Sequence, residues 1–446
     1  MVQIKAMRGT QDLLPANSHE WRSIEDALMG LSERFGYKEI RTPVFESTDL
    51  FQRGVGDTTD VVQKEMYTFE DKGGRSITLR PEGTAGVVRA AIEHGLLNNA
   101  FPLKLSYLTS CYRYEKPQAG RLREFHQFGV ECFGTKEPIA DAQLILFAQR
   151  IFDELGVENL ALEINSIGCP HCRAEYHKAL KEYFTAHLEE LCETCKGRLE
   201  KNPMRILDCK SPVCKKIAAG APVILDYLCE ECKEHFEKVR EYLNIADIPY
   251  RVNPRIVRGL DYYTKTVFEF VSTDIGAQGA VLGGGRYDGL VEELGGKSVP
   301  ALGFAMGMER LVLLMKAQQI GMHAPLTPSI YLCSIGDNAL KTCLTLADEL
   351  ISDGFYADFD VVGRGLKAQM KYADKISAAF TAVIGDDDIE RGTVKIKNMQ
   401  SGETVESDFL SFAETFENLY IEYLENAPFD FGEELIKDIS GETDDE

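Results

Sequence analysis

The sequence predicts an α+β protein in three parts: a domain with an antiparallel sheet flanked by helices, a mostly helical insertion within it, and a C-terminal α/β domain. Two strand-like runs, 106–113 and 125–133, are joined by a polar loop containing Pro and Gly, which is typical of an antiparallel hairpin. Residues 169–243 read mostly helical and are rich in Cys, Lys and Glu. Residues 329–425 alternate strand and helix signals, which predicts a mostly parallel sheet with covered faces.

The 446 residues are too many for one compact core, so we expect more than one domain. The predicted domains are 1–325, with the insertion at about 169–243, and 326–425. Their boundary falls in a stretch with Pro and Gly residues that is typical of a linker. The remaining segment, 426–446, is acidic and weakly apolar, and we expect it to be disordered or loosely attached.

Apolar spacing predicts the individual elements. Trp21 to Phe35 has apolar residues at helical spacing and ends at Gly36, a helix stop. Further strands of the first domain are expected at 160–167, 248–257 and 266–271, and a further helix at 307–319. In the C-terminal domain, strands are expected at 329–334, 356–359 and 382–384, and helices at 338–353 and 367–379.

The composition argues against a membrane protein. No apolar run approaches the roughly 20 residues that span a bilayer, and the N-terminus lacks a signal-peptide core. We therefore expect a cytoplasmic protein whose twelve cysteines are reduced or metal-bound rather than paired in disulfides.

The charge distribution is compatible with a nucleic-acid partner although the net charge is −22. Residues 401–446 hold fifteen Asp or Glu and one Lys, a net of −14, which leaves −8 for the first 400 residues. RNA binding requires a local basic surface, not a basic protein. Candidate surfaces are a cluster of Arg113, Lys116, Arg121 and Arg123, and a helix-spaced stripe of Lys367, Lys371 and Lys375, for which a solvated helix face is the alternative.

Two segments concentrate residues suited to ligand binding. The run Arg258-Gly259-Leu260-Asp261-Tyr262-Tyr263 places a cation, an acid and two phenols around one glycine. The run Gly283-Gly284-Gly285-Arg286-Tyr287-Asp288-Gly289 ends the next strand signal, and its glycines let the backbone come close to a ligand. A polar turn between strands does not need two phenols and two arginines clustered around glycines, so a binding site is favoured.

Both runs resemble the signature motifs of histidyl-tRNA synthetases. Three more segments, 40–46, 112–131 and 303–311, resemble the motifs shared by class II aminoacyl-tRNA synthetases, and all five stand in the family's order. The resemblance covers most of the chain. It implies an enzyme that activates L-histidine with ATP, with Mg²⁺ expected, and transfers histidine to the 3′ end of tRNA(His). It also implies a homodimer with the first motif in its interface, and a C-terminal anticodon-binding domain.

The resemblance assigns ATP binding to Arg113 at the α-phosphate, Arg121 and Arg310 at the terminal phosphates, Glu115 at the adenine amino group and Phe125 against the adenine ring. In-line displacement at phosphorus needs positioning and charge stabilisation more than covalent catalysis, which suits arginines.

The same resemblance makes Arg258 the second catalytic residue with Arg113, at the α-phosphate; a salt bridge with Asp261 is the competing interpretation. It assigns histidine binding to Glu82, Gly83, Thr84, Gln127, Glu131, Tyr262 and Tyr263. Neutral imidazole has one N–H donor and one acceptor nitrogen, and Glu131 and Tyr263 are the implied partners of its ring. Such a polar site rejects analogues that leave it unpaired, so no editing domain is expected.

Eight cysteines of the insertion form pairs at zinc-knuckle spacing: Cys169 and Cys172, Cys192 and Cys195, Cys209 and Cys214, and Cys229 and Cys232. They are sufficient for two structural Zn²⁺ ions with four thiolates each, or for one ion with cysteines left over. Reduced thiols without metal are the alternative. The resemblance does not decide, because many histidyl enzymes lack these cysteines.

Two other functions are compatible with parts of the chain. One is a catalytically inactive paralogue, such as the regulatory subunit of ATP phosphoribosyltransferase, and the other is a zinc-dependent RNA-binding protein. The intact segment around Arg258 and the C-terminal domain favour the ligase over the paralogue, and only the cysteines support the RNA-binding protein.

Overall fold

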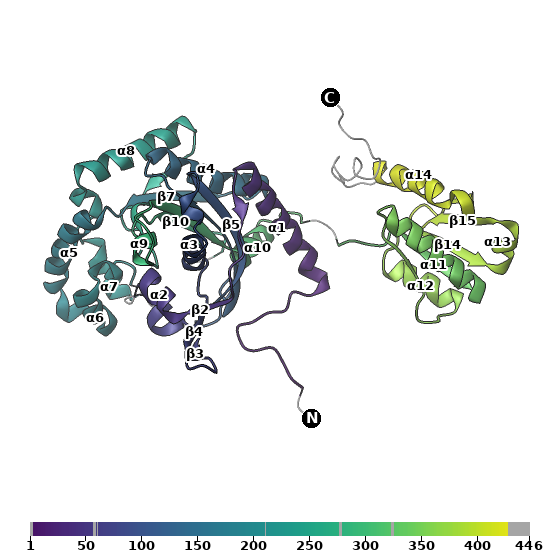
Figure 1. Ribbon diagram of the computed structural model, residues 1–446, viewed down its shortest axis with the longest axis horizontal. Coiled ribbons are helices and arrows are strands. Elements are labelled where there is room, and N and C mark those ends of the chain that lie inside the picture. The colour runs from purple at the N-terminus through teal and green to yellow at the C-terminus, as the bar shows by residue number, and fades with distance from the viewer. Residues whose placement is uncertain are drawn as a thin grey trace. The chain divides into compact units, whose positions relative to one another are not determined.

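The computed structural model describes residues 3–56, 59, 61–209, 211–275, 279–322 and 325–426. The chain divides into two compact units, Met1–His323 and Ala324–Glu446 (Figure 1). The predicted acidic tail lies beyond Asn426, outside the described residues, so its disorder stays a prediction.

An eight-stranded sheet forms the centre of the first unit, in the order β1-β5-β6-β11-β10-β9-β7-β8. Its strands are β1 (Lys38–Glu39), β5 (Leu103–Tyr112), β6 (Glu124–Phe133), β7 (Leu160–Ser166), β8 (Arg251–Val252), β9 (Thr264–Ser272), β10 (Ala280–Arg286) and β11 (Ala301–Gly307). The inner pairs are antiparallel, and the outermost pairs, β1 with β5 and β7 with β8, are parallel. The predicted antiparallel sheet is confirmed.

The predicted hairpin is β5 with β6, paired from Leu103 with Phe133 to Tyr112 with Glu124. The strand expected over 248–257 is wrong in length, because only β8 forms. Pro254 follows closely and has no N–H to donate to a neighbouring strand, so the pairing ends there.

Helices cover both faces of this sheet. On one face, α1 (Pro15–Arg34), α4 (Pro138–Glu154), α8 (Glu230–Ile245) and α10 (Met308–Ala317) share an apolar core with Phe268. On the other, α3 (Thr84–Glu93), α5 (Pro170–Thr185) and α9 (Leu290–Glu293) pack with Val267. These two adjacent residues of β9 point to opposite faces, as the alternation of a strand requires. The short helix α2 (Thr48–Val55) packs beside α3.

The segment between β7 and β8 is the helical insertion, formed by α5, α6 (Glu193–Lys201), α7 (Pro212–Ala219) and α8. Its buried side chains Tyr176, Leu199 and Ile206 belong to the same apolar core as Tyr262 and Tyr263 of the first signature run. The insertion is therefore packed on that run and shares its core.

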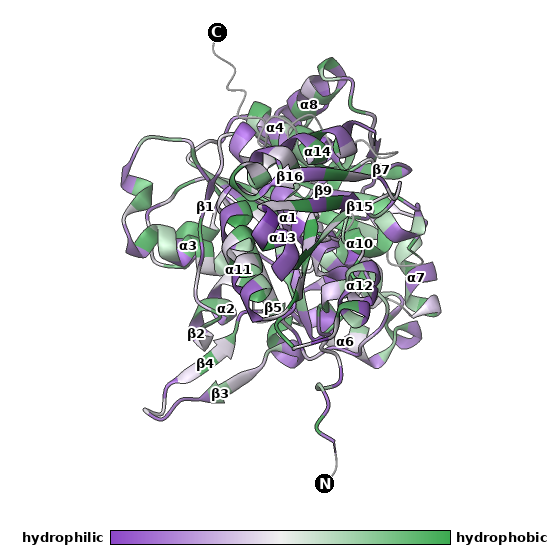
Figure 2. Ribbon diagram, turned by 90° about the vertical axis from the view of Figure 1, so that its right-hand side faces the viewer, coloured by the Kyte–Doolittle hydropathy of each residue, from purple (hydrophilic) through white to green (hydrophobic). Residues whose placement is uncertain are grey.

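A small sheet of β2 (Phe45–Ser47), β4 (Ser76–Leu79) and β3 (Thr68–Glu70) was not predicted. The hairpin of β3 and β4 projects from the first unit in both ribbon views, and little of it is coloured hydrophobic in Figure 2. All of β3 is exposed, so the apolar spacing used to identify buried strands was weak there.

The second unit is a five-stranded sheet in the order β13-β12-β14-β15-β16, with helices α11 (Asp337–Ser352), α12 (Leu366–Lys375), α13 (Asp386–Arg391) and α14 (Phe412–Glu425). Its strands are β12 (Ile330–Ile335), β13 (Ala357–Phe359), β14 (Phe380–Gly385), β15 (Thr393–Asn398) and β16 (Thr404–Asp408). The predicted α/β pattern is confirmed for the first three strands, which are parallel.

The expectation of a mostly parallel sheet is wrong, because β15 and β16 join antiparallel and make the sheet mixed. Val394 and Ile396 are buried while Lys395 between them is exposed, a half-buried alternation typical of a strand near a sheet edge.

Candidate active site

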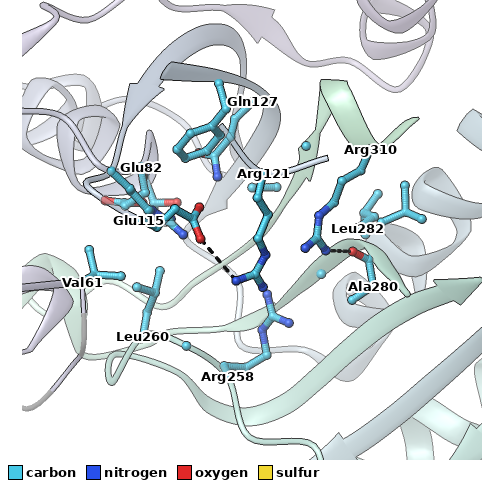
Figure 3. Close-up of a pocket in the computed structure, with 18 of the residues that line it drawn as sticks. Val61, Glu82, Glu115, Arg121, Gln127, Arg258, Leu260, Ala280, Leu282 and Arg310 are labelled. Atoms are coloured by element: carbon cyan, nitrogen blue, oxygen red, sulfur yellow. Dashed lines mark hydrogen bonds and ion pairs between the residues drawn. The ribbon is translucent and has the colours of Figure 1, made fainter. Parts of the chain in front are cut away.

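One cavity of about 290 Å³ brings together most of the predicted site residues. Those that line it are Glu82, Thr84, Arg113, Glu115, Arg121, Phe125, Gln127, Arg258, Tyr262, Tyr263 and Arg310. They come from the start of α3, from β6 and the loop before it, from the loop before β9, and from α10. Figure 3 shows Arg121, Arg258 and Arg310 pointing toward one another inside the cavity.

Arg258 forms an ion pair with Glu269 of β9, and its side chain is only 19% exposed. Its guanidinium lies 5.5 Å from the centre of the Tyr263 ring. Burial opposes the charge, but Glu269 outweighs it and raises the pKa of Arg258, so the cation persists. The alternative salt bridge with Asp261 is not formed: Asp261 Oδ1 instead lies 2.7 Å from Nη2 of Arg205.

Gly283 makes the position of Arg258 available. Gly283 of β10 pairs with Glu269 of β9, so the arginine lies over both strands. A Cβ at Gly283 would lie 2.5 Å from both terminal nitrogens of Arg258. The first glycine of the second signature run therefore provides the space for the guanidinium of the first.

The three arginines predicted to bind ATP are engaged with protein groups. Nη1 of Arg121 lies 3.3 Å from Glu115, and Arg310 donates to the carbonyl of Ala280 (Figure 3). Arg113 donates from Nε to the carbonyl of Pro81 at 2.8 Å and lies 5.1 Å from the centre of the Phe125 ring. These contacts orient three cations around one cavity.

Glu82 sits at the N-terminus of α3. Its carboxylate accepts hydrogen bonds from the backbone N–H groups of Thr84, at 2.7 Å, and Ala85, at 2.8 Å. Burial nevertheless raises the pKa of Glu82. A buried anion facing a polar cavity is a suitable partner for an ammonium group.

Glu131 and Gly83 are not among the residues that line the described cavity. Glu131 is buried beneath it, where it accepts hydrogen bonds from Tyr107, at 3.0 Å, and Tyr287. Burial raises the pKa of Glu131 to about 8. Gly83 gives room to the Tyr107 ring, which would lie 2.2 Å from a Cβ at that position.

Four polar residues at or beside the cavity were not predicted from the motifs: Tyr107, Tyr287, Glu269 and Glu309. Glu309 lines the cavity and accepts from both the backbone N–H and Nδ1 of His126, at 3.0 and 2.9 Å. Tyr287 lies in the run 283–289 and Glu309 in the motif 303–311, so their polar character was a usable signal. For Tyr107, the only signal in the sequence is its position in a strand of alternating burial.

A separate feature is the cysteines of the insertion, which form two groups of four. The described structure gathers Cys169, Cys172, Cys229 and Cys232 in one group, and Cys192, Cys195, Cys209 and Cys214 in the other, with sulfurs within 4.8 Å of one another in each. All are free thiols. The backbone N–H of Cys229 lies 3.1 Å from Sγ of Cys172, and that of Cys192 lies 3.3 Å from Sγ of Cys214.

The electrostatics favour thiolates at one cysteine of each group. Burial acts to raise the pKa of Cys169, but hydrogen bonds from Cys172 and His171 lower it to about 7. The pKa of Cys192 is likewise lowered to about 7 against the effect of burial, by hydrogen bonds from the other cysteines of its group. Thiolate is the form that binds metal.

Comparisons with known proteins identify the family. A family model described as histidyl-tRNA synthetase matches residues 9–311, and one described as anticodon binding domain matches residues 329–419. A histidine–tRNA ligase of Caldanaerobacter subterraneus subsp. tengcongensis is 55% identical over 402 residues, which are 90% of this chain and 96% of that protein. A histidine–tRNA ligase of Halothermothrix orenii is 50% identical over 418 residues, 94% of this chain and 100% of that protein.

A solved structure agrees with these relatives. The crystal structure of apo histidyl-tRNA synthetase from S. aureus matches with a TM-score of 0.80 and 42% sequence identity, over 93% of this chain and 100% of that one. Because the matches extend through both compact units, they confirm the predicted fold class and function and do not favour an inactive paralogue. The chain belongs to the histidyl-tRNA synthetase family and is an aminoacyl-tRNA ligase.

Proposed function

Histidine activation with ATP and transfer to tRNA(His) is the reaction of the family, and we propose which side chains of this cavity perform each part. Most of the predicted ATP and histidine residues come from separate segments and converge on one cavity, which supports this assignment.

Arg258 and Arg113 stabilise the α-phosphate as the histidine carboxylate attacks it and pyrophosphate leaves. A fixed guanidinium can donate two parallel hydrogen bonds to growing negative charge. The pair with Glu269 and the bond to Pro81 orient the two arginines before substrate arrives, so little reorganisation accompanies the reaction.

Glu115 and Arg121 take part in ATP binding by exchanging partners. In this structure they are paired with each other. The adenine amino group is a donor for Glu115, and the terminal phosphates attract Arg121 and Arg310. ATP therefore replaces one partly buried ion pair with two separate contacts, and Phe125 stacks on the adenine.

Histidine is held by its ammonium, carboxylate and ring. Glu82 binds the ammonium with Thr84, and Gln127 positions the carboxylate. Tyr263, with Tyr262 beside it, meets one ring nitrogen, while Gly83 admits Tyr107 beneath the site. Glu131 receives the ring N–H when one of the phenols now bonded to it, Tyr107 or Tyr287, gives up its bond.

Mg²⁺ is the metal ion expected with ATP in this reaction. The ion binds proteins through one or two carboxylates plus substrate phosphates, and Glu309, a carboxylate that lines the cavity, would be such a ligand. When bound, Mg²⁺ neutralises charge on the departing pyrophosphate. Structural Zn²⁺ in the two cysteine groups also belongs to this proposal, because four clustered thiols are a zinc-type donor set.

The partners are tRNA(His) and a second copy of the chain. Lys367, Lys371 and Lys375 are all exposed on α12, the position expected of a phosphate-contacting face in an anticodon-binding unit. In the first motif, Val44 and Phe45 are 41% and 56% exposed, which suits a homodimer interface. No helix among the described residues is long and apolar enough to cross a membrane. We place the enzyme in the cytoplasm, where its substrates ATP and tRNA are found.

The test is histidine-dependent exchange of pyrophosphate into ATP by Arg258→Ala. Loss of one transition-state donor should lower kcat by roughly 10²–10³-fold with ATP and histidine affinities near wild type. The matched control is Arg251→Ala, which removes another arginine paired with a glutamate, Glu163, outside the cavity, and should leave kcat unchanged. An unchanged kcat in Arg258→Ala removes this residue from the mechanism.

A further inference from the structure

We infer that the insertion binds two zinc ions, one in each cysteine group, and that these ions hold the segment 258–265, here called the signature loop, in its histidine-binding geometry. This inference rests on the proposed role of the signature loop in binding histidine. It adds a function to the insertion, whose cysteines would otherwise stabilise only the insertion itself.

The two groups have the geometry of tetrahedral sites. Four sulfurs each about 2.3 Å from one ion at tetrahedral angles lie roughly 3.8 Å apart. Sγ of Cys169 is 3.6 Å from that of Cys172 and 4.0 Å from that of Cys229, and Sγ of Cys192 is 3.8 Å from that of Cys209. The groups are nested in sequence: the first and last pairs form one site, which will be called the outer site, and the middle pairs form the other, the inner site.

The inner site is connected to the signature loop through Arg205. This residue lies between Cys195 and Cys209 in a short helical turn, Pro203–Ile206, and is buried. Its Nη2 donates to the carbonyl of Gly259 at 2.9 Å and to Asp261 at 2.7 Å. Both acceptors belong to the signature loop: Gly259 directly follows Arg258, and Asp261 directly precedes Tyr262.

The outer site is connected to the other end of the loop. Arg173, next to Cys172, donates to the carbonyl of Tyr263 at 3.1 Å. Glu231, between Cys229 and Cys232, pairs with Lys265 at 2.8 Å. The backbone N–H of Lys265 also donates at 2.9 Å to the carbonyl of Gly168, the residue before Cys169.

Each zinc site is therefore connected to the signature loop by hydrogen bonds or ion pairs from side chains close in sequence to its cysteine ligands. Metal binding by thiolates is coupled to the folding of the segment that carries them, so loss of zinc should release Arg205 and Arg173 from the loop. Tyr262 and Tyr263 would lose their fixed backbone, whereas Arg113, Glu115 and Phe125 on the hairpin make no such contact in the described structure. Histidine affinity should fall more than ATP affinity.

The first experiment tests the sites by elemental analysis of the full chain. We expect two zinc per chain in the wild type and one in each of Cys172→Ser and Cys195→Ser. A double variant within one site, Cys172→Ser with Cys229→Ser, should keep one zinc, whereas the cross-site double Cys172→Ser with Cys195→Ser should keep none. Absence of zinc from the wild type overturns the metal sites, and a cross-site double that keeps one zinc overturns the pairing.

The second experiment tests the coupling with Arg205→Met, which leaves every thiol in place. We expect two zinc per chain, a histidine KM raised roughly tenfold or more through loss of charge-assisted bonds, and an ATP KM within about twofold of wild type. Arg205→Lys should restore part of the histidine affinity. The matched control is Arg240→Met in the same insertion, where the arginine contacts Glu237 and Tyr250 and not the loop.

Hydrogen exchange separates coupling from misfolding. In Arg205→Met, protection should fall in the signature loop and be kept in α5 and α8. If Arg205→Met binds two zinc and has the wild-type histidine KM, the coupling is wrong but the metal sites are still supported. Absence of histidine-dependent exchange in the wild type overturns instead the proposed function on which this inference rests.

Discussion

Replacing Gly283 by Ala should disable catalysis without removing any group that binds substrate. The added methyl would stand 2.5 Å from both terminal nitrogens of Arg258 and 2.7 Å from its Cζ. Carbon–heavy-atom contacts are favourable at about 3.5–4.0 Å, so the guanidinium must move by roughly 1 Å. It cannot keep its place between Gly283 and Glu269, because these two residues face each other across β9 and β10.

The magnitude follows from that displacement. A misplacement of about 1 Å in a catalytic group costs on the order of 10²-fold in rate. We therefore expect histidine-dependent pyrophosphate exchange by Gly283→Ala to lose roughly 10²-fold in kcat. Crowding in a packed site should lower the free energy of unfolding by about 1–3 kcal/mol, measurable by denaturant titration.

The control for this substitution is Gly289→Ala in the same glycine-rich run. A Cβ at Gly289 meets nothing within 4 Å, so the variant should exchange pyrophosphate at the wild-type rate. Gly283→Ala with activity within about twofold of Gly289→Ala would refute the claim that this glycine makes room for the catalytic arginine.

Two further predictions concern Glu131 and the C-terminal unit. The pKa of Glu131 is raised from 4.5 to about 8 by burial, so the folded state holds a proton that the unfolded chain releases. The stability from this group is full below pH 4.5 and is lost as pH rises toward 8. The free energy of unfolding of Glu131→Gln should therefore rise relative to that of wild type by about a few kcal/mol as the pH increases from 5 to 8, and its histidine KM should be higher. The same difference in free energy of unfolding at pH 5 and at pH 8 would contradict this. Removal of residues 326–446 should preserve part of histidine activation and reduce tRNA charging much more, and equal losses would mean that the second unit stabilises the first.

The sequence was sufficient to predict most of the charged residues that line the cavity but not all of their contacts. Arg258 and Asp261 are close in sequence, so a salt bridge between them was a reasonable interpretation. The structure pairs Arg258 with Glu269 and Asp261 with Arg205, and both partners depend on which elements fold beside the loop. Such contacts are set by tertiary packing, which spacing alone does not specify.

The hydrogen bond from Tyr107 to Glu131 could be predicted in part from the sequence. The hairpin was predicted, and its register pairs Tyr107 with Gly129, two residues from Glu131 on the same strand. Residues two apart on one strand share a face, so the contact follows once the register is known. Register depends on the loop between the strands, and that loop was not predictable in detail.

The cysteines show what spacing leaves open. Four pairs can be combined in three ways into two groups, and the sequence does not choose among them. The helices of the insertion bring the first pair to the last and the two middle pairs together. Strands β15 and β16 were not predicted because their apolar signal is weak: exposed Lys395 separates buried Val394 and Ile396 in β15, and most of β16 is exposed.

We propose that Arg258 and Arg113 together stabilise the α-phosphate in the active-site cavity. A crystal structure with a non-hydrolysable analogue of histidyl-adenylate tests it most directly. We predict α-phosphate oxygens at hydrogen-bonding distance, about 3 Å, from the guanidinium groups of both arginines, with the imidazole ring beside Tyr263. An analogue bound with its phosphate beyond about 5 Å of Arg258 would contradict the claim.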